Sequence, residues 1–323
     1  MQYKRFVISL ITFLVILCPL FVLIAKKYDS SSTILIKEKS GWILNKTGGM
    51  YDIAFLGSSR VHNIVATKTV DTLLGVNSIN LGVGGAAYPE NYLLLEQFLR
   101  RNKIKTLCLQ VDMWGLIYGE QAYSHSFSEE KYLHLLGDRV VDSVYSKNTN
   151  PLKFYFRKYV PFFKYSEYNS IYSVEKMLFG IIPDNRNTFD KYKGAELLEG
   201  RKEGIVFGRT DVTKLKKMEY SSNSTMSLRN IIGLAKSKSI NVVLFTTPIF
   251  TSFKQYLLFD KTARDTIHKI AMEYKLPYFN FDDEKISSDS LLFRDPTHLN
   301  YNGGILFTIN FCDTLKKYNY GKN

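Results

Sequence analysis

The most pronounced pattern in the chain is an apolar stretch close to its start. Residues 6–25 read FVISLITFLVILCPLFVLIA, and no side chain among them is charged. About 20 apolar residues suffice for a helix to cross the hydrocarbon core of a bilayer. The stretch is longer than the core of a typical signal peptide, and no small-x-small cleavage site follows it directly. We expect an uncleaved membrane anchor over residues 1–27, with a cleaved signal peptide as the alternative.

Beyond the anchor, short apolar runs alternate with segments of helical periodicity. The apolar runs predict strands at 51–59, 78–81, 105–112, 241–247 and 277–281. The pattern also predicts helices at 61–74 and 89–102 and an apolar helix at the C-terminus. Strands that alternate with helices indicate a parallel sheet covered on both faces. We therefore predict an α/β fold, a three-layer flavodoxin-like domain over residues 28–323.

The alternation stops in an interval at about 114–220. This interval is rich in Tyr, Phe, Lys and Arg, as in FYFRKYVPFFKY at 154–165. One interpretation is a helical insertion whose aromatic side chains pack on the main domain. The other is a cap over an active site, where aromatic faces hold sugar rings or acyl chains and basic groups hold an anionic polymer. The two interpretations are compatible.

Composition and charge restrict the partners of the protein. A chain of 323 residues with 45% hydrophobic and 23% charged residues has the balance of a globular protein with a sizeable core. A formal net charge of +13 favours anionic partners. Lys and Arg are spread along the whole sequence, without a zinc-finger spacing or an aromatic RNA-binding signature. Nucleic acid is therefore not expected as a partner.

The three cysteines, Cys18, Cys108 and Cys312, each lie within an apolar run and show no metal-ligand spacing. We expect buried thiols that act as small hydrophobic groups, and no metal site. A single disulfide between Cys108 and Cys312 stays open as an alternative.

Ser59 occupies a position that suits a nucleophile. It follows the first predicted strand on a turn that reads Gly57-Ser58-Ser59-Arg60. Ligands of parallel α/β sheets bind outside the carboxyl ends of the strands, so a side chain on this turn is available for chemistry. The alternative is that Ser59 is only the N-cap of the helix that follows.

A second candidate element reads Asp295-Pro296-Thr297-His298 and precedes the C-terminal helix. An Asp three residues before a His can place its carboxylate beside the imidazole, fix the tautomer and stabilise the imidazolium. The alternative is a proline turn followed by an ordinary surface histidine.

Glycines follow the second predicted strand in the sequence NLGVGG, which ends at Gly85. Glycines at a strand end let the backbone approach a ligand closely, and an N–H group there can donate to a developing oxyanion. Glycines also serve ordinary turns.

In their order and spacing, these three elements resemble the SGNH, or GDSL-like, hydrolase superfamily. The resemblance covers residues 51–112 and 241–318 and leaves the insertion out. It implies that Ser59 is the nucleophile, that the backbone N–H groups of Ser59 and Gly85 form the oxyanion hole, that His298 is the general base and that Asp295 orients it. Neither a metal nor a cofactor is implied.

The chain departs from the family pattern at two positions. Ser58 stands where the family has the Asp of Gly-Asp-Ser, and Asp112 follows the third strand where the family has an oxyanion Asn. An ionised carboxylate accepts hydrogen bonds but does not donate them. Trp114 is a candidate for the missing donor, and we assign Arg60, Asp112 and Trp114 to substrate binding.

Together these features favour a serine-dependent acyl-ester hydrolase or O-acyltransferase that acts on a cell-envelope polysaccharide or related polymer. Such an enzyme would be a single-pass membrane protein of a bacterial envelope with an extracytoplasmic catalytic domain. Acyl transfer would imply a multi-span acyltransferase as partner. The alternative is a catalytically weak or inactive polymer-binding or scaffold protein of the same fold.

Overall fold

The computed structural model describes residues 2–31, 39–118, 129–160, 163, 186–200, 219–220, 222–254, 260–282 and 285–320. The chain divides into two compact units, which are described separately. One comprises residues 1–38 and 129–184, and the other comprises residues 39–128 and 185–323.

The larger unit is built on a parallel sheet of five strands in the order β2-β1-β3-β6-β7. The strands are β1 (Met50–Leu56), β2 (Ser78–Asn80), β3 (Lys103–Gln110), β6 (Asn241–Phe245) and β7 (Tyr278–Phe279). This is the flavodoxin-like order: β2 is added on one side of β1, and β3, β6 and β7 follow on the other, so the strand order reverses between β1 and β3. The predicted α/β class is confirmed. The central strands read as continuous apolar runs because both of their faces are covered.

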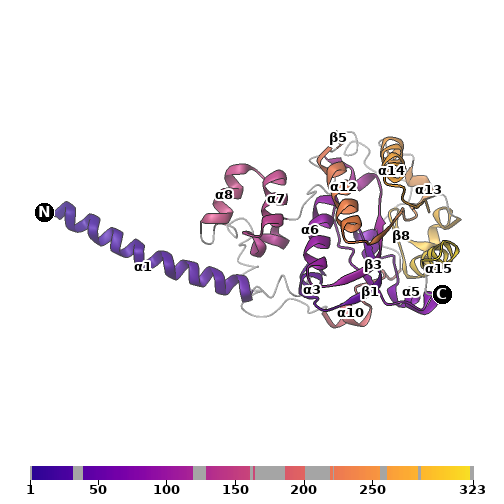
Figure 1. Cartoon of the computed structure of the whole chain (residues 1–323), viewed down its shortest axis with the longest axis horizontal. Helices are drawn as coiled ribbons and strands as arrows, with labels where there is room; N and C mark the ends of the chain where they lie inside the picture. Colours follow the sequence, from indigo (N-terminus) through magenta and orange to yellow (C-terminus); the bar gives the residue numbers. More distant parts are fainter. Residues whose placement is uncertain are drawn as a thin grey trace. The chain divides into compact units, whose positions relative to one another are not determined.

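Helices cover both faces of the sheet (Figure 1). On one face lie α3 (Lys39–Asn45), α6 (Tyr88–Leu99), α12 (Ser222–Ser237) and α14 (Asp260–Tyr274), and on the other lie α5 (Thr67–Leu74) and α15 (Tyr301–Lys317). Phe311 of α15 lies with its ring centroid 4.6 Å from that of Phe245 on β6. These contacts form the centre of the hydrophobic core. The predicted three-layer arrangement is therefore confirmed.

Shorter elements connect these layers and carry several of the candidate residues. They are α4 (Ser59–His62), η1 (Met113–Gly115), the antiparallel pair β4 (Ile117–Tyr118) and β5 (Glu219–Tyr220), α10 (Arg186–Lys191), α13 (Thr251–Lys254), η4 (Lys285–Ser288), η5 (Ser290–Leu292), and the hairpin of β8 (Phe293–Asp295) and β9 (His298–Leu299).

The helix predicted at 61–74 is interrupted. The structure has α4 and α5 there, with residues 63–66 between them. Asn80 donates from Nδ2 to the carbonyl oxygens of Val61 (2.8 Å) and Val65 (3.1 Å), and Thr308 accepts from the N–H of Ala66 (3.1 Å). These distant side chains satisfy backbone groups between the two helices, while the N–H of Val65 keeps its helical bond to the carbonyl of Val61 (3.2 Å).

A segment at 186–200 runs along the outer edge of β2. The N–H of Asn80 donates to the carbonyl of Lys193 (2.9 Å), and the buried ammonium of Lys39 donates to the carbonyl of Gly194. Trp42 donates from its indole nitrogen to Asp190 (2.9 Å). The segment thus satisfies and covers a strand edge that would otherwise be open to pairing with another chain.

The cysteines follow the main expectation in the larger unit. Cys108 and Cys312 are free and buried, so the alternative of a disulfide between them is wrong. Burial raises the pKa of both thiols, that of Cys312 to about 12. Cys18, which we expected to be buried, is exposed on the surface of α1.

The smaller unit contains α1 (Gln2–Ser31), η2 (Glu129–Leu135), α7 (Arg139–Asn148) and α8 (Pro151–Tyr159). Within α1, the window Tyr3–Leu20 has a mean hydropathy of 1.8, and none of it is buried. α1 is long and apolar enough to cross a membrane, and a signal sequence near the N-terminus would have the same length and composition. The described part of the predicted insertion is mainly helical. Residues 119–128, 161–162, 164–185 and 201–218 of it lie outside the described residues.

Candidate active site

Ser59 lies at the carboxyl end of β1, where the turn begins α4. The N-cap of α4 is Ser58, whose Oγ accepts from the N–H of Arg60 (3.3 Å). Ser59 is therefore the first residue inside the helix, and the alternative that it is the cap is wrong. The turn requires glycine at Gly57, because an added Cβ would lie 2.6 Å from Cγ2 of Val61 and 2.7 Å from Cβ of Gln110.

Asp295 and His298 are brought together by the hairpin of β8 and β9. One carboxylate oxygen of Asp295 accepts from the backbone N–H groups of Thr297 (2.9 Å) and His298 (3.0 Å), which closes the turn. Nδ1 of His298 lies 3.0 Å from each carboxylate oxygen. Its other ring nitrogen, Nε2, lies 2.8 Å from Oγ of Ser59. The three side chains thus form one hydrogen-bonded chain.

The electrostatics of these three hydrogen-bonded side chains suit proton transfer from Ser59. Burial by itself would raise the pKa of Asp295, but hydrogen bonds and charge from His298, together with hydrogen bonds from Thr297, lower it to about 2. The carboxylate is therefore ionised at neutral pH and favours the imidazole tautomer with its proton on Nδ1. Nε2 is then left with a lone pair that accepts the Oγ–H of Ser59.

Two backbone N–H groups, one on the Ser59 turn and one on a neighbouring loop, are candidate donors to an oxyanion. The loop after β2 runs beside the Ser59 turn, since Leu81 donates to the carbonyl of Phe55 (2.7 Å) and Val83 to that of Gly57 (3.1 Å). The loop ends at Gly85, whose φ is +75°. Within the described part of the chain, the N–H groups of Ser59 and Gly85 have no hydrogen-bond acceptor. These are the two donors that the resemblance predicts, and their role in an oxyanion hole stays a prediction.

Asp112, at the position of the family's oxyanion Asn, faces protein groups. Its Oδ2 lies 2.9 Å from Nη1 of Arg60 and also accepts from the side-chain amide of Gln110. Its Oδ1 accepts from the N–H of Gly115 (3.1 Å), which caps η1. Both carboxylate oxygens thus act as acceptors from protein donors. Asp112 therefore does not replace the amide of the missing Asn.

Arg60 is held inside the protein. The residue is 3% exposed, and its guanidinium also donates to the carbonyl of Thr247 and lies 3.9 Å from Asp282. This placement makes Arg60 a structural cation under the Ser59 turn, which differs from the substrate contact that we expected. Trp114 and Asp112 are half-buried, and substrate contact by either stays a prediction.

Gln110 is a residue of the site that sequence analysis missed. Its Oε1 accepts from the N–H (2.9 Å) and Oγ (3.0 Å) of Ser58, while its amide donates to Asp112. Gln110 therefore connects the Ser59 turn to the Asp112–Arg60 ion pair. The signal in the sequence was a polar residue directly after the apolar run Leu107-Cys108-Leu109 of the strand.

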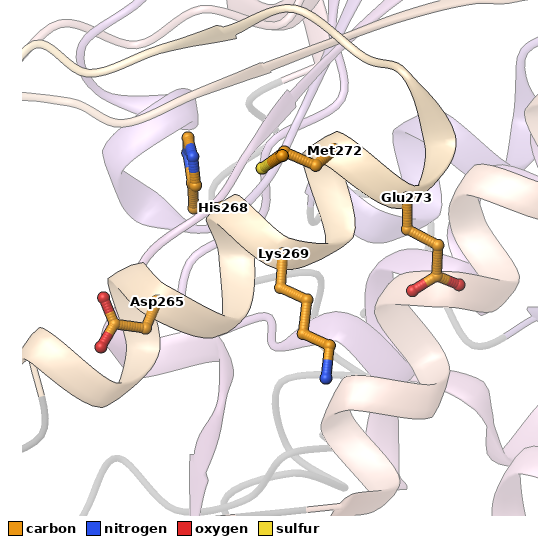
Figure 2. A pocket seen from close by; sticks show the side chains of 5 residues that line it. All are labelled: Asp265, His268, Lys269, Met272 and Glu273. Carbon is orange, nitrogen blue, oxygen red and sulfur yellow. The ribbon is translucent and has the colours of Figure 1, made fainter.

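A separate shallow hollow lies on α14 and contains none of the three hydrogen-bonded side chains. Five residues line it: Asp265, His268, Lys269, Met272 and Glu273. Figure 2 shows these side chains pointing away from the helix in different directions, without converging on a common point. Within the described residues, no group of three or more His, Cys, Asp and Glu could hold a metal ion.

No protein-family model and no curated protein matches this sequence. The solved structures that it resembles include acylhydrolase and G-D-S-L-family proteins. A proposed acylhydrolase from Bacteroides fragilis is 11% identical, with a TM-score of 0.40 and coverage of 90% of this chain and 95% of that one. A proposed G-D-S-L-family lipolytic protein from Desulfitobacterium hafniense is 8% identical, with a TM-score of 0.41 and coverage of 82% and 99%.

A protein from Streptococcus pneumoniae described as a proposed platelet activating factor is 11% identical, with a TM-score of 0.41 and coverage of 98% of both chains. At these identities and TM-scores, the likenesses say nothing about activity or substrate.

Proposed function

We propose that this protein is a serine-dependent acyl-ester hydrolase or O-acyltransferase. The observation that carries the proposal is the hydrogen-bonded chain from Ser59 through His298 to Asp295. It lies outside the carboxyl end of β1, beside the point where the strand order reverses, which is where parallel α/β sheets bind ligands. The N–H groups of Ser59 and Gly85 support the same reading.

In the first half of the proposed reaction, Oγ of Ser59 attacks the ester carbonyl carbon and its proton passes to Nε2 of His298. The oxyanion that forms accepts hydrogen bonds from the N–H groups of Ser59 and Gly85. When the intermediate collapses, the bond to the leaving alkoxide breaks and the alkoxide takes the proton from His298. The product is an acyl-serine, while Asp295 stabilises the imidazolium throughout.

In the second half, an acceptor hydroxyl attacks the acyl-serine. His298 takes the proton of the acceptor and returns it to Oγ of Ser59 as the acyl group leaves. Water as acceptor gives hydrolysis, and a sugar hydroxyl gives transfer. Because Asp112 supplies no donor, the oxyanion has one donor fewer than in the resembled family. The loss of such a donor costs about 10²- to 10³-fold in rate, so we expect a slow enzyme with simple esters.

The proposed substrate is an O-acylated polysaccharide or related polymer of a bacterial cell envelope. The net charge of +13 supports an anionic polymer, and the apolar helix α1 supports a position at a membrane. We further propose that α1 is a single-pass anchor and that the catalytic unit is extracytoplasmic. If the acyl group is transferred, a multi-span acyltransferase is the expected partner.

A fluorophosphonate probe tests the serine directly on the detergent-solubilised full chain. We expect covalent labelling of the native protein and none of Ser59→Ala or His298→Ala. Ser237→Ala is the matched control, because it removes the hydroxyl of an exposed serine on α12 and leaves the Ser59 turn intact. If the folded native chain is not labelled, the proposal fails and the polymer-binding or scaffold alternative is favoured.

A further inference from the structure

Helix α8 of the smaller unit presents an exposed apolar stripe. Leu152, Tyr155, Phe156 and Tyr159 recur at the spacing i, i+3, i+4 and i+7, so they share one face of the helix. Their exposed fractions lie between 42% and 66%. Single exposed apolar residues are ordinary, but a contiguous stripe on a soluble surface marks an interaction site.

The opposite face of α8 is fixed on α7, so a small rotation would not hide the stripe. Phe154 and Arg157 on this inner face are 7% and 2% exposed. The ammonium of Lys158 lies 2.7 Å from the carboxylate of Asp142 on α7, which ties the two helices together (Figure 1). Asn150 caps the N-terminus of α8 and fixes where the helix begins.

The aromatic side chains of the stripe are also ordered by their neighbours. The rings of Tyr155 and Tyr159 are stacked at a centroid distance of 6.3 Å. Phe156 lies 5.2 Å from the ring of Phe163. Tyrosine suits the boundary between water and lipid, because its ring is apolar and its hydroxyl reaches polar groups.

The charge around the stripe selects a partner. Without the buried Arg157, residues 139–160 carry four basic side chains and one acidic side chain, a net charge of +3. A short helix with aromatic and aliphatic residues on one side and basic residues around it is the composition of an interfacial membrane helix. The stripe is one exposed helix face, which suits the plane of a bilayer. The same compact unit contains α1, the helix that can span a membrane.

We propose that α8 lies in the interface of an anionic bilayer, with Leu152, Tyr155, Phe156 and Tyr159 inserted among the lipids. The inference rests on the membrane location in the proposed function, and it is independent of catalysis by Ser59. A second attachment point would add to the hold of α1, because the two contacts belong to one chain and act together.

The test places a nitroxide spin label on the full chain in lipid nanodiscs that contain phosphatidylglycerol. Cys18→Ala removes the exposed native thiol, while Cys108 and Cys312 are buried and stay unlabelled. Tyr155→Cys and Tyr159→Cys report on the stripe. Tyr301→Cys, an exposed tyrosine of α15 in the larger unit, is the matched control.

We expect the labels at positions 155 and 159 to collide several-fold more with oxygen, relative to a water-soluble nickel complex, than the label at 301. Equal ratios at all three positions would show that the stripe faces water, and low collision rates with both reagents would show that protein covers it. Either outcome overturns the proposal.

Two further experiments change the lipid composition and probe the reactivity of Ser59. In nanodiscs of phosphatidylcholine alone, we expect shallower insertion at 155 and 159, and unchanged depth would overturn the role of anionic lipid. Each labelled chain is also treated with the fluorophosphonate probe. If α8 inserts but the probe does not react with Ser59, this inference holds and the proposed function fails. If the probe reacts with Ser59 but α8 does not insert, the proposed function holds and this inference fails.

Discussion

Oγ of Ser59 lies 2.8 Å from Nε2 of His298, although 239 positions separate the two residues in the chain. The contact forms because β1 ends beside the hairpin that precedes α15. Both residues are held by their own turns: Ser59 by the cap of α4, and His298 by the hydrogen bonds that Asp295 accepts. The reacting side chains are therefore positioned before any substrate binds, which lowers the cost of reaching the transition state.

Asp295→Asn should nearly abolish catalysis without unfolding the protein. An amide nitrogen facing Nδ1 of His298 would donate to it and favour the tautomer with the proton on Nε2, which no longer accepts the proton of Ser59. We expect kcat for an activated ester to fall on the order of 10⁴-fold. Asp265→Asn on the exposed face of α14 is the control and should retain full activity. A loss of less than about tenfold would contradict the assigned role of Asp295.

Arg60→Met should strongly destabilise the larger unit. It leaves the carboxylate of Asp112, whose side chain is only 10% exposed, without its cation, and removing one partner of a largely buried ion pair costs about 3–5 kcal/mol. Thermal and urea unfolding of the detergent-solubilised chain measure the change. Arg100→Met, which breaks the surface pair with Glu96, is the control and should cost less than about 1 kcal/mol. Equal effects of the two substitutions would show that burial of Arg60 has no energetic consequence.

Gly85→Ala should lower kcat and leave KM nearly unchanged. Space is available for the added methyl group, but φ of +75° costs a residue with a Cβ on the order of 1–2 kcal/mol, so the peptide rotates and its N–H moves. The expected loss approaches the 10²- to 10³-fold range typical of a missing oxyanion donor. Gly84→Ala also has space and lacks the positive φ, so it should behave as the native enzyme. If both variants are equally active, Gly85 is no donor.

His62→Phe should reduce the acid sensitivity of folding. Burial, and then the charge of Lys39, lower the pKa of His62 well below 6.5, and Glu196 at 3.4 Å is too exposed to reverse this. Below pH 6.5 the His62 imidazole is protonated in the unfolded chain but stays neutral in the folded chain. The free energy of unfolding therefore falls as pH drops. The slope attributable to His62 is at most about 1.4 kcal/mol per pH unit, and it is absent above the unfolded pKa.

Urea unfolding at a series of pH values from neutral to mildly acidic measures this slope for the native chain and for His62→Phe. The variant should show a flatter dependence, whatever its absolute stability. His268→Gln, which changes an exposed histidine, is the control substitution. Parallel curves for the native chain and His62→Phe would mean that His62 is protonated in the folded protein.

The elements that depend on neighbouring residues could be predicted from the sequence. The run at 51–59 predicted β1 because a strand buried on both faces needs apolar residues at every position. The contact between Asp295 and His298 could also be predicted, because a spacing of three residues lets one short turn bring carboxylate and imidazole together. Their pairing with Ser59 was inferred from order and resemblance.

The features that could not be predicted depend on contacts between residues far apart in the chain. Asn80 and Thr308 interrupt the helix predicted at 61–74, and nothing within that segment indicates the break. We assigned Arg60 to substrate binding because it adjoins Ser59, and only the structure shows that it is 3% exposed and paired with Asp112. A sequence determines which segments form strands, helices and turns, because those preferences are local. The tertiary structure decides which polar groups meet, because a buried charge or donor takes its role from partners that folding alone brings within reach.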